Sequence, residues 1–504
     1  MQNLETLLPH LAYPDKVIED LLKYITKAEV ETSQIPNLLK ASCNHLDTLG
    51  RVLNDLCQGI APDSNVEQLI INLKNLVGSP ETFSLQKIES ELAHLLSLAK
   101  TLSPSDSSTL RECQALTSAT MQDYLPAAKY CRLGSGICGI DNLQKWNLLH
   151  LEATFLGDYG REFSDDSALQ KAIDLLRFEI LVHTEKNKIQ DQKIYSLHTL
   201  GTLLGIIGQR RSGTRYLEES VQAYHDALEL CEEQVAGSIW ASMQNGLGNA
   251  LGALGQRQSN NGLCEQAIES FEKALQFRTE QNTPDEWAST LNNMAAILHS
   301  LGRKNKDPKI LKRAVDAYKK VLRTWTKSKN PMDWATAMYN LGTALSSLGE
   351  HRRGPRTLEQ AIAAYNSSLS IRSKEQLPEH WAITQNNLGT TLQKLAEREH
   401  STDTMQRAID AYQNTLTIWT QKSVPMVWAM SMANLGVARR RLAEMNSNQE
   451  DADRAVTEIS SAVKVFRSAS HAKYTELGEE QLSLTRKLLT KLVTEEQTAK
   501  NTSS

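Results

Sequence analysis

Apolar residues recur at helical spacing in a segment near the middle of the chain. In residues 334–349, WATAMYNLGTALSSLG, large apolar side chains recur at steps of four and three, which places them on one face of an α-helix. These residues are Trp334, Met338, Leu341, Leu345 and Leu348. After a polar turn, a second stripe over residues 358–369 predicts another helix, and Thr357 with Gln360 predicts a capping box at its start. The pattern therefore predicts a helical hairpin.

This hairpin pattern repeats along the chain with a period of 47 residues. Tryptophan begins five units, and looser copies begin at Lys193 and Trp146, which makes seven units. The five tryptophans are Trp240, Trp287, Trp334, Trp381 and Trp428. Because one hairpin cannot bury both of its stripes, neighbouring units must stack. The sequence predicts an all-α fold, a right-handed superhelical solenoid of stacked helical hairpins, with the five tryptophans buried in its core.

Proline precedes four of these tryptophans by three residues, at Pro284, Pro331, Pro378 and Pro425. Proline suits the first turn of a helix, where its missing N–H group costs nothing. We therefore expect the first helix of each of these units, helix A, to begin near its proline.

The runs NLGTAL (340–345) and LEQAIAAYNSSL (358–369) resemble the tetratricopeptide repeat, in which asparagine, leucine and glycine lie in helix A, and alanine and an aromatic residue lie in helix B. The usual repeat has about 34 residues. Lengthening of both connections gives 47 here, which resembles a long-repeat bacterial subclass. In that subclass such arrays often accompany caspase-like peptidase or signalling ATPase domains, so the resemblance implies a multiprotein regulatory system; neither domain is evident in this sequence.

The periodic region predicts the organisation of the whole chain. Residues 1–130 lack the period and are expected to form a separate α-helical segment, and residues 131–145 a glycine-containing joint. Residues 146–474 hold the seven repeats, and residues 475–504 a capping helix with a polar tail.

Composition narrows the classes of partner. The 504 residues carry a formal net charge of -4, so no global positive field favours nucleic acid. The seven cysteines are scattered without CxxC spacing, which favours reduced thiols over disulfides or a zinc site. The sequence has neither a leader-like N-terminus nor an apolar run long enough for a membrane span. We therefore expect a cytoplasmic protein.

Motifs that would indicate chemistry are weak. GSGICG at 134–139 matches GxGxxG, but it follows a predicted helix rather than a strand, so a flexible joint is favoured over a nucleotide site. No feature places a histidine beside Cys131 or Cys138, and histidines lack metal-ligand spacing. We expect no catalytic residue, cofactor or metal, and no enzymatic activity.

Basic residues in the loops between helices A and B would line one edge of the array and leave an anionic partner conceivable, although ordinary loop solvation is the preferred interpretation. They are Arg210, Arg211, Arg257, Arg303, Lys304, Lys306, Arg352, Arg353 and Arg398.

Polar residues lie on helix A opposite its apolar stripe. The family resemblance assigns this side to a concave groove and assigns ligand contact to Asn293, Asn340, Asn387 and Asn434. A primary amide can pair with any peptide bond, because it both donates and accepts. The predicted binding residues are Asn245, Asn249, Asn293, Asn340, Thr343, Asn387, Thr390 and Asn434. The alternative, that these asparagines bond only to neighbouring helices, stays open.

Two functions follow from this organisation. In the preferred one, the chain is a non-enzymatic scaffold or adaptor whose groove holds a peptide or a partner protein. In the alternative, residues 1–130 form an effector or catalytic segment that the solenoid delivers. A pocket with converging polar groups in the N-terminal segment would favour the alternative.

Overall fold

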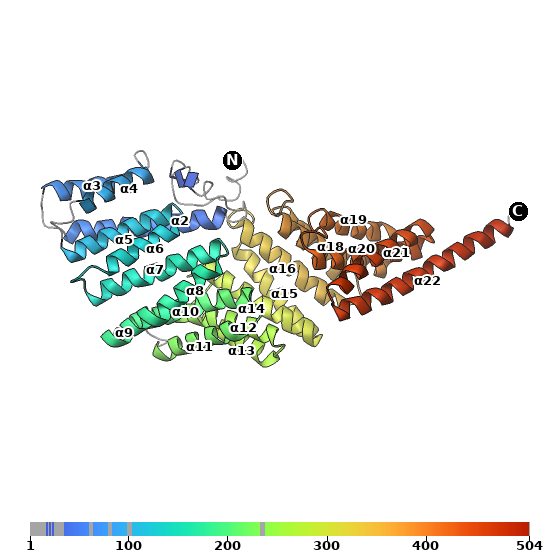
Figure 1. Ribbon diagram of the computed structural model, residues 1–504. Coiled ribbons are helices and arrows are strands. Elements are labelled where there is room, and N and C mark those ends of the chain that lie inside the picture. Colours follow the sequence, from blue (N-terminus) through green and yellow to red (C-terminus); the bar gives the residue numbers. More distant parts are fainter. Residues whose placement is uncertain are drawn as a thin grey trace. The chain divides into compact units, whose positions relative to one another are not determined.

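The computed structural model describes residues 35–59, 64–78, 83–97, 103–231 and 237–502, together with six positions between residues 17 and 24. Within these ranges every regular element is a helix, and consecutive helices pack pairwise in hairpins (Figure 1). The predicted all-α class is confirmed. The chain divides into two compact units between Asn293 and Met294.

The first unit begins with helices that precede the repeats. These are α2 (Ile35–Gly59), α3 (Ser64–Gly78), α4 (Leu85–Ser97), α5 (Pro104–Thr120) and α6 (Tyr124–Ser135). The unit continues with α7 (Asn142–Glu162), α8 (Asp166–Leu175), the π-helical turn η2 (Leu176–Ile180), α9 (Leu181–Asn187), α10 (Gln190–Arg210), α11 (Arg215–Leu230), α12 (Gly237–Arg257) and α13 (Asn261–Phe277). The division between the two units falls within α14 (Pro284–Asn305).

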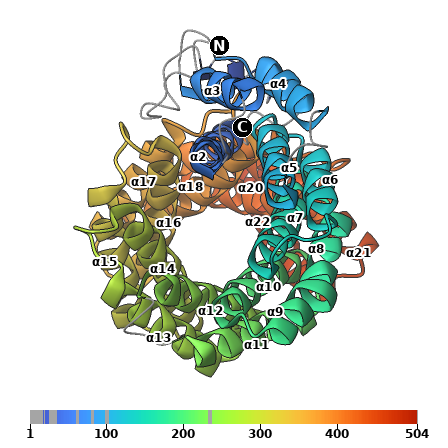
Figure 2. The ribbon, with the colours of Figure 1, turned by 90° about the vertical axis from the view of Figure 1, so that its left-hand side faces the viewer.

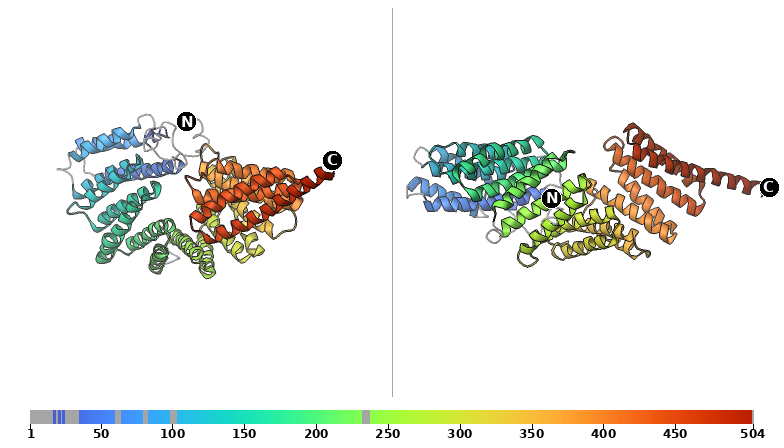
Figure 3. Two further views of the ribbon diagram at one scale, coloured as in Figure 1. Left: turned by 45° about the vertical axis from the view of Figure 1, so that its right-hand side comes forward. Right: turned by 90° about the horizontal axis from the view of Figure 1, so that it is seen from below.

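The second unit continues the hairpins and ends with a long helix. Its helices are α15 (Pro308–Thr324), α16 (Pro331–Glu350), α17 (Arg356–Leu369), α18 (Pro378–Glu399), α19 (Thr402–Leu416), α20 (Pro425–Asn446), α21 (Gln449–Ser468) and α22 (Ala472–Thr502). These helices stack in chain order, and α22 runs past the helices on which it packs (Figure 3). The four prolines begin α14, α16, α18 and α20, as predicted.

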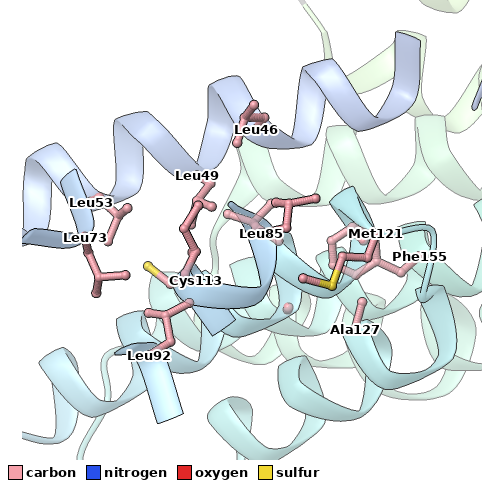
Figure 4. Close-up of a cluster of buried hydrophobic side chains, with 14 of the residues drawn as sticks. Leu46, Leu49, Leu53, Leu73, Leu85, Leu92, Cys113, Met121, Ala127 and Phe155 are labelled. Carbon is pink, nitrogen blue, oxygen red and sulfur yellow. The ribbon is translucent and has the colours of Figure 1, made fainter. Parts of the chain in front are cut away.

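The helices that precede the repeats share a leucine-rich core (Figure 4). Leu49 and Leu53 of α2 are fully buried, and they belong to the same cluster as Leu73 of α3 and Leu85 of α4. Phe155 of α7 belongs to this cluster too, so the core of α2–α6 continues onto the first helix of the first repeat. The domain boundaries given above stay predictions.

A small residue on helix A faces a large one on helix B in successive hairpins. A Cβ atom built on Gly342 would lie 2.9 Å from the ring of Tyr365. A Cβ atom on Gly389 would lie 3.0 Å from the Tyr412 ring. Real Cβ contacts are rarely this short, so glycine allows the aromatic ring to lie directly against the backbone of helix A. Both tyrosines are 1% exposed.

The turn between helices A and B is built the same way in five repeats. The residue before the cap has a positive φ angle at Ser164, Ser259, Lys306, His400 and Ser447. The next residue caps helix B with its side chain, at Asp165, Asn260, Asp307, Ser401 and Asn448. The predicted capping box at Thr357 is wrong: α17 begins at Arg356 after Pro355, without a side-chain cap. In this repeat Gly354 stands at the capping register and offers no side chain.

The burial of the five tryptophans was predicted correctly only for Trp240, which is 7% exposed and lies 5.3 Å from the Phe277 ring between centroids. The other four are half-buried. The reason is their place in the first turn of helix A, where the following alanine faces the core instead. This alanine is fully buried at Ala241, Ala288, Ala335, Ala382 and Ala429.

Candidate binding face of the A helices

The A helices of each unit lie in one layer and the B helices in another. Figure 2 shows α16 and α18 on one side of α15 and α17 in the second unit, and α10 and α12 on one side of α11 and α13 in the first. On α16 the residues Thr336, Tyr339, Asn340 and Thr343 lie on one side of the helix. We call this side, and the equivalent positions at steps of 47 residues on the other A helices, the A face. These four residues are half-buried on α16. The A face is therefore accessible over the helices that the sequence singled out.

All eight predicted binding residues lie on A helices and are half-buried. Three belong to the first unit: Asn245, Asn249 and Asn293. The second unit holds the other five: Asn340, Thr343, Asn387, Thr390 and Asn434. Their partial exposure permits contact with a ligand, and their binding role stays a prediction.

The two threonines of this set hold the tyrosines of helix B. The Tyr365 hydroxyl donates to Thr343 Oγ1 at 3.2 Å, and the Tyr412 hydroxyl donates to Thr390 Oγ1 at 3.0 Å. Burial raises the pKa of both tyrosines above its ordinary value, so the hydroxyls stay protonated. Each threonine therefore joins the A face to the packing behind it.

The asparagines of the A face differ in their partners. Asn387 Nδ2 donates to the Tyr339 hydroxyl at 2.8 Å, which links α18 to α16. Asn387 therefore bonds to a neighbouring helix, which is the alternative left open by the sequence. Its side-chain carbonyl oxygen takes no part in that bond. Among the described residues, Asn249 and Asn434 have no side-chain hydrogen bond. In the first unit, Asn245 Oδ1 is buried without a partner.

Arg372 lies beside this part of the A face and was missed by the sequence analysis. It follows the end of α17, is 4% exposed, and donates from Nη2 to Thr336 Oγ1 at 2.8 Å. Its guanidinium carbon lies 5.2 Å from the centroid of the Tyr339 ring, and its Nε is buried without a partner. Burial lowers the pKa of Arg372 from its ordinary value. No carboxylate of the described residues pairs with it.

Comparison with protein families gives a match to the tetratricopeptide repeat over residues 240–285 and 287–322. These two matched segments are tetratricopeptide repeats. Comparison with curated proteins gives no match.

Among solved structures, the chain is similar to a tetratricopeptide repeat protein from Parabacteroides merdae, with 17% identity, a TM-score of 0.37, and coverage of 66% of this chain and 98% of that one. It is also similar to a signal transduction ATPase with numerous domains and a tetratricopeptide repeat sensor from Pyrococcus horikoshii. There the identity is 13%, the TM-score 0.44, and the coverage 89% of this chain and 64% of that one. Identities this low concern the fold alone.

Three of the loop arginines connect successive hairpins. Arg257 Nη1 donates to the carbonyls of Gly208 and Gly213, each at 2.6 Å. Arg398 donates in the same way to the carbonyls of Gly349 and Gly354, and Arg210 to those of Gly160 and Arg161. These carbonyls lie where the preceding A helix ends and its hydrogen bonds run out. The three arginines therefore stabilise the stack, as well as giving charge to its edge.

Other candidate chemistry lies away from the A face. Cys131 is buried, which raises the pKa of its thiol well above the ordinary value and disfavours a thiolate. The GSGICG segment begins in the last residues of α6 and reaches Gly139, whose φ of +93° favours glycine. Within the described ranges, no group of histidine, cysteine and carboxylate residues could hold a metal ion. None of the described helices combines the length and apolar character of a membrane span.

Polar groups also meet where the N-terminal helices join the first repeat, but they bind one another. Arg132 of α6 pairs with Glu152 of α7, with Nε and Oε2 2.9 Å apart, and with Glu179 of η2, with Nη1 and Oε2 2.6 Å apart. Burial raises the pKa of Glu152 to about 7, and Arg132 opposes this rise. Asn147 Nδ2 donates to Glu112 at 3.0 Å. These bonds join α5, α6, α7 and η2 to one another.

Proposed function

We propose that the chain is a non-enzymatic scaffold whose A face in the second unit binds an extended segment of a partner protein. The observation that carries this proposal is the register of half-buried amides on α16, α18 and α20: Asn340, Asn387 and Asn434. Tetratricopeptide arrays generally serve protein interaction, which supports the assignment of this surface. The repeats would belong to the long type of 47 residues, as their recurring turn suggests.

The chemistry of the amides suits an extended peptide. Adjacent A helices are spaced by about 10 Å, and an extended chain advances about 3.3 Å per residue. Successive amides would therefore meet every third residue of a ligand. An amide pairs with a peptide group whatever side chain that residue carries, so the ladder would supply affinity while its neighbours supply selectivity.

The packing of the N-terminal helices supports a scaffold rather than a delivered catalyst. The polar groups at their junction with the first repeat are bonded among themselves. Asn72, Asn75, Lys87 and Ser90 line an open hollow between α3 and α4, but their side chains are exposed to solvent, whereas catalytic groups are commonly held in buried sites that shift their pKa. We propose that these helices cover the first end of the array. The chain would work in a reducing compartment such as the cytoplasm, since the buried cysteines in the described ranges carry no disulfide.

The test compares capture by the wild type with capture by Asn340→Ala/Asn387→Ala. Partners are isolated from the native cell on each immobilised protein, quantified by mass spectrometry, and then titrated by calorimetry. A matched control, Asn366→Ala/Asn414→Ala, removes two exposed amides from the B helices α17 and α19. We expect affinity for the A-face partner to fall about tenfold or more in the first variant, because each lost amide leaves a desolvated peptide group without a bond.

The control should bind as the wild type does. Equal binding by all three proteins would show that the amides are not the site. The bond from Asn387 to Tyr339 makes a small fall in melting temperature expected. Loss of binding in a first variant that is already partly unfolded at the assay temperature would assign these asparagines to stability instead.

A further inference from the structure

The register of Arg372 in the repeat shows that the fold does not require a positive charge there. The residues one repeat before and one and two repeats after it are Trp325, Trp419 and Phe466. All three are buried, with exposures of 7%, 7% and 3%. A large apolar side chain thus fills this position between hairpins in the neighbouring repeats. Arg372 supplies similar bulk, but it adds a guanidinium in a place where charge is costly.

The arginine at the same register two repeats before the site, Arg278, is compensated more fully. Arg278 is half-buried and donates to Thr290 Oγ1 at 2.9 Å and to Ser242 Oγ at 2.8 Å. The carboxylate of Glu286 also acts on it and favours its charged form. Arg372 has one hydroxyl partner and a tyrosine ring, and its Nε has no partner. A buried cation of this kind leaves bonding capacity for an anion.

We propose that Arg372, with Thr336 and Tyr339, forms a subsite for a carboxylate group of the bound peptide. This inference rests on the function proposed above and adds a charge requirement to its ligand. The single positive charge of a guanidinium matches the single negative charge of a carboxylate, and its planar donors match the two oxygens. The Tyr339 hydroxyl already receives the amide of Asn387, so the subsite adjoins the amide ladder.

The neighbouring repeats also provide the test variant. Arg372→Trp introduces the residue found at 325 and 419 and should keep or raise the thermal midpoint, because it removes a buried charge and retains the bulk. Arg372→Lys keeps the charge but loses the planar donors, and Arg372→Gln provides a second neutral variant if the tryptophan disturbs the fold. Circular dichroism melting checks each protein before binding is measured.

The probe is an array of random nonapeptides, each synthesised with a free and with an amidated C-terminus, and a matched set in which phosphoserine replaces glutamate. Peptides that bind the wild type are then titrated by fluorescence anisotropy with each variant. We expect acidic peptides to be enriched on the wild type. Neutralising the critical carboxylate should lower wild-type affinity at least tenfold and Arg372→Trp affinity less than twofold, with Arg372→Lys between them.

The two C-terminal forms distinguish a terminal carboxylate from an aspartate or glutamate side chain, and either result supports the subsite. Binding that is indifferent to both the carboxylate and Arg372 would overturn this inference and leave the proposed function intact. Preference for phosphoserine over glutamate that depends on Arg372 would overturn the carboxylate assignment. Absence of any peptide binding to the folded wild type would contradict the proposed function and this inference together.

Discussion

The side of each A helix that packs on its own B helix repeats its residues more strictly than the A face does. Glycine or alanine stands at the A-helix register of Gly342 from residue 201 to residue 436. Five of the six facing B-helix residues are aromatic, at Tyr224, Phe271, Tyr318, Tyr365 and Tyr412, and the last is Ile459. The A-face register of Tyr339, by contrast, holds His198, Asn245, Asn292, Tyr339, Asn386 and Ala433.

This contrast separates the requirements of packing from those of recognition. Contact between helices A and B is set by shape, because an aromatic ring lies within van der Waals distance of a helix backbone. Any repeat that lost the small residue would have to move its ring. The Asn340 register keeps asparagine at 293, 340, 387 and 434. The other A-face registers have no such constraint, so their residues can differ from one repeat to the next. A chain built this way can present a varied surface on a uniform frame.

The strictly repeated side should give the largest response to truncation. Tyr365→Ala removes a side chain that is 1% exposed and leaves a cavity, so we expect a loss of about 3–5 kcal/mol of unfolding free energy. Urea denaturation followed by circular dichroism measures it. Tyr365→Phe is the control, since it removes only the bond to Thr343 and should cost about 0.5–1.5 kcal/mol. Equal costs for the two variants would contradict the packing role of the ring.

The tryptophans extend the comparison to residues of unequal burial. Trp240→Ala removes a ring that is 7% exposed, and we expect a loss of about 3 kcal/mol. Trp334→Ala removes a half-buried ring, over which the Lys327 ammonium lies 5.8 Å from the ring centroid. We expect a loss of about 1–2 kcal/mol there, from partial burial and the cation–π contact. Hydrogen exchange in α12 and α16 measures the local loss of stability in each variant. A larger loss for Trp334→Ala than for Trp240→Ala would contradict the expected order.

Gly342→Ala tests the other partner of the A–B contact. The added Cβ would lie 2.9 Å from the Tyr365 ring, so the ring must shift, and we expect a loss of about 1–3 kcal/mol despite the better helix propensity of alanine. Gly354→Ala is the matched control, because nothing lies within 4 Å of its Cβ position. It should change the unfolding free energy by no more than about 0.5 kcal/mol. A stabilised Gly342→Ala protein would show that the contact can relax.

Periodicity in the sequence predicted the hairpins and the prolines that begin α14, α16, α18 and α20. It could not predict the burial of the tryptophans. Helix A is covered both by its own B helix and by neighbouring repeats, so Ala335 and Gly342 are buried outside the large-residue stripe. A stripe of large residues marks only part of such a helix. Trp334, in the first turn, lies at the margin of that coverage.

The capping error and the missed arginine have separate causes. The series Asn260, Asp307, Ser401 and Asn448 has the same period as the tryptophans and could have located the caps, with Gly213 and Gly354 as the exceptions. Arg372 stands one repeat after Trp325 and one repeat before Trp419. The two tryptophans indicate that this position of the repeat is buried. Its lack of a carboxylate partner, however, depends on three-dimensional contacts that no single sequence specifies.

The smallest expected effects lie on the A face and distinguish its two kinds of asparagine. Asn387→Ala removes the donor to the Tyr339 hydroxyl, so we expect a loss of about 0.5–1.5 kcal/mol of unfolding free energy. Asn434→Ala removes a half-buried amide with no side-chain hydrogen bond among the described residues, and should stay within about 0.5 kcal/mol. Urea denaturation of both variants, with Asn414→Ala on α19 as an exposed control, measures the difference.

The result decides how the asparagine register is to be understood. If Asn434→Ala leaves stability unchanged and weakens partner binding, the amide is present for the ligand, because the folded chain does not use it. If Asn434→Ala costs as much as Asn387→Ala, the register has a common structural role, and the A face must recognise its partner through other residues. An effect of Asn387→Ala on binding alone would mean that its bond to Tyr339 contributes no net stability and that its amide is available to the partner.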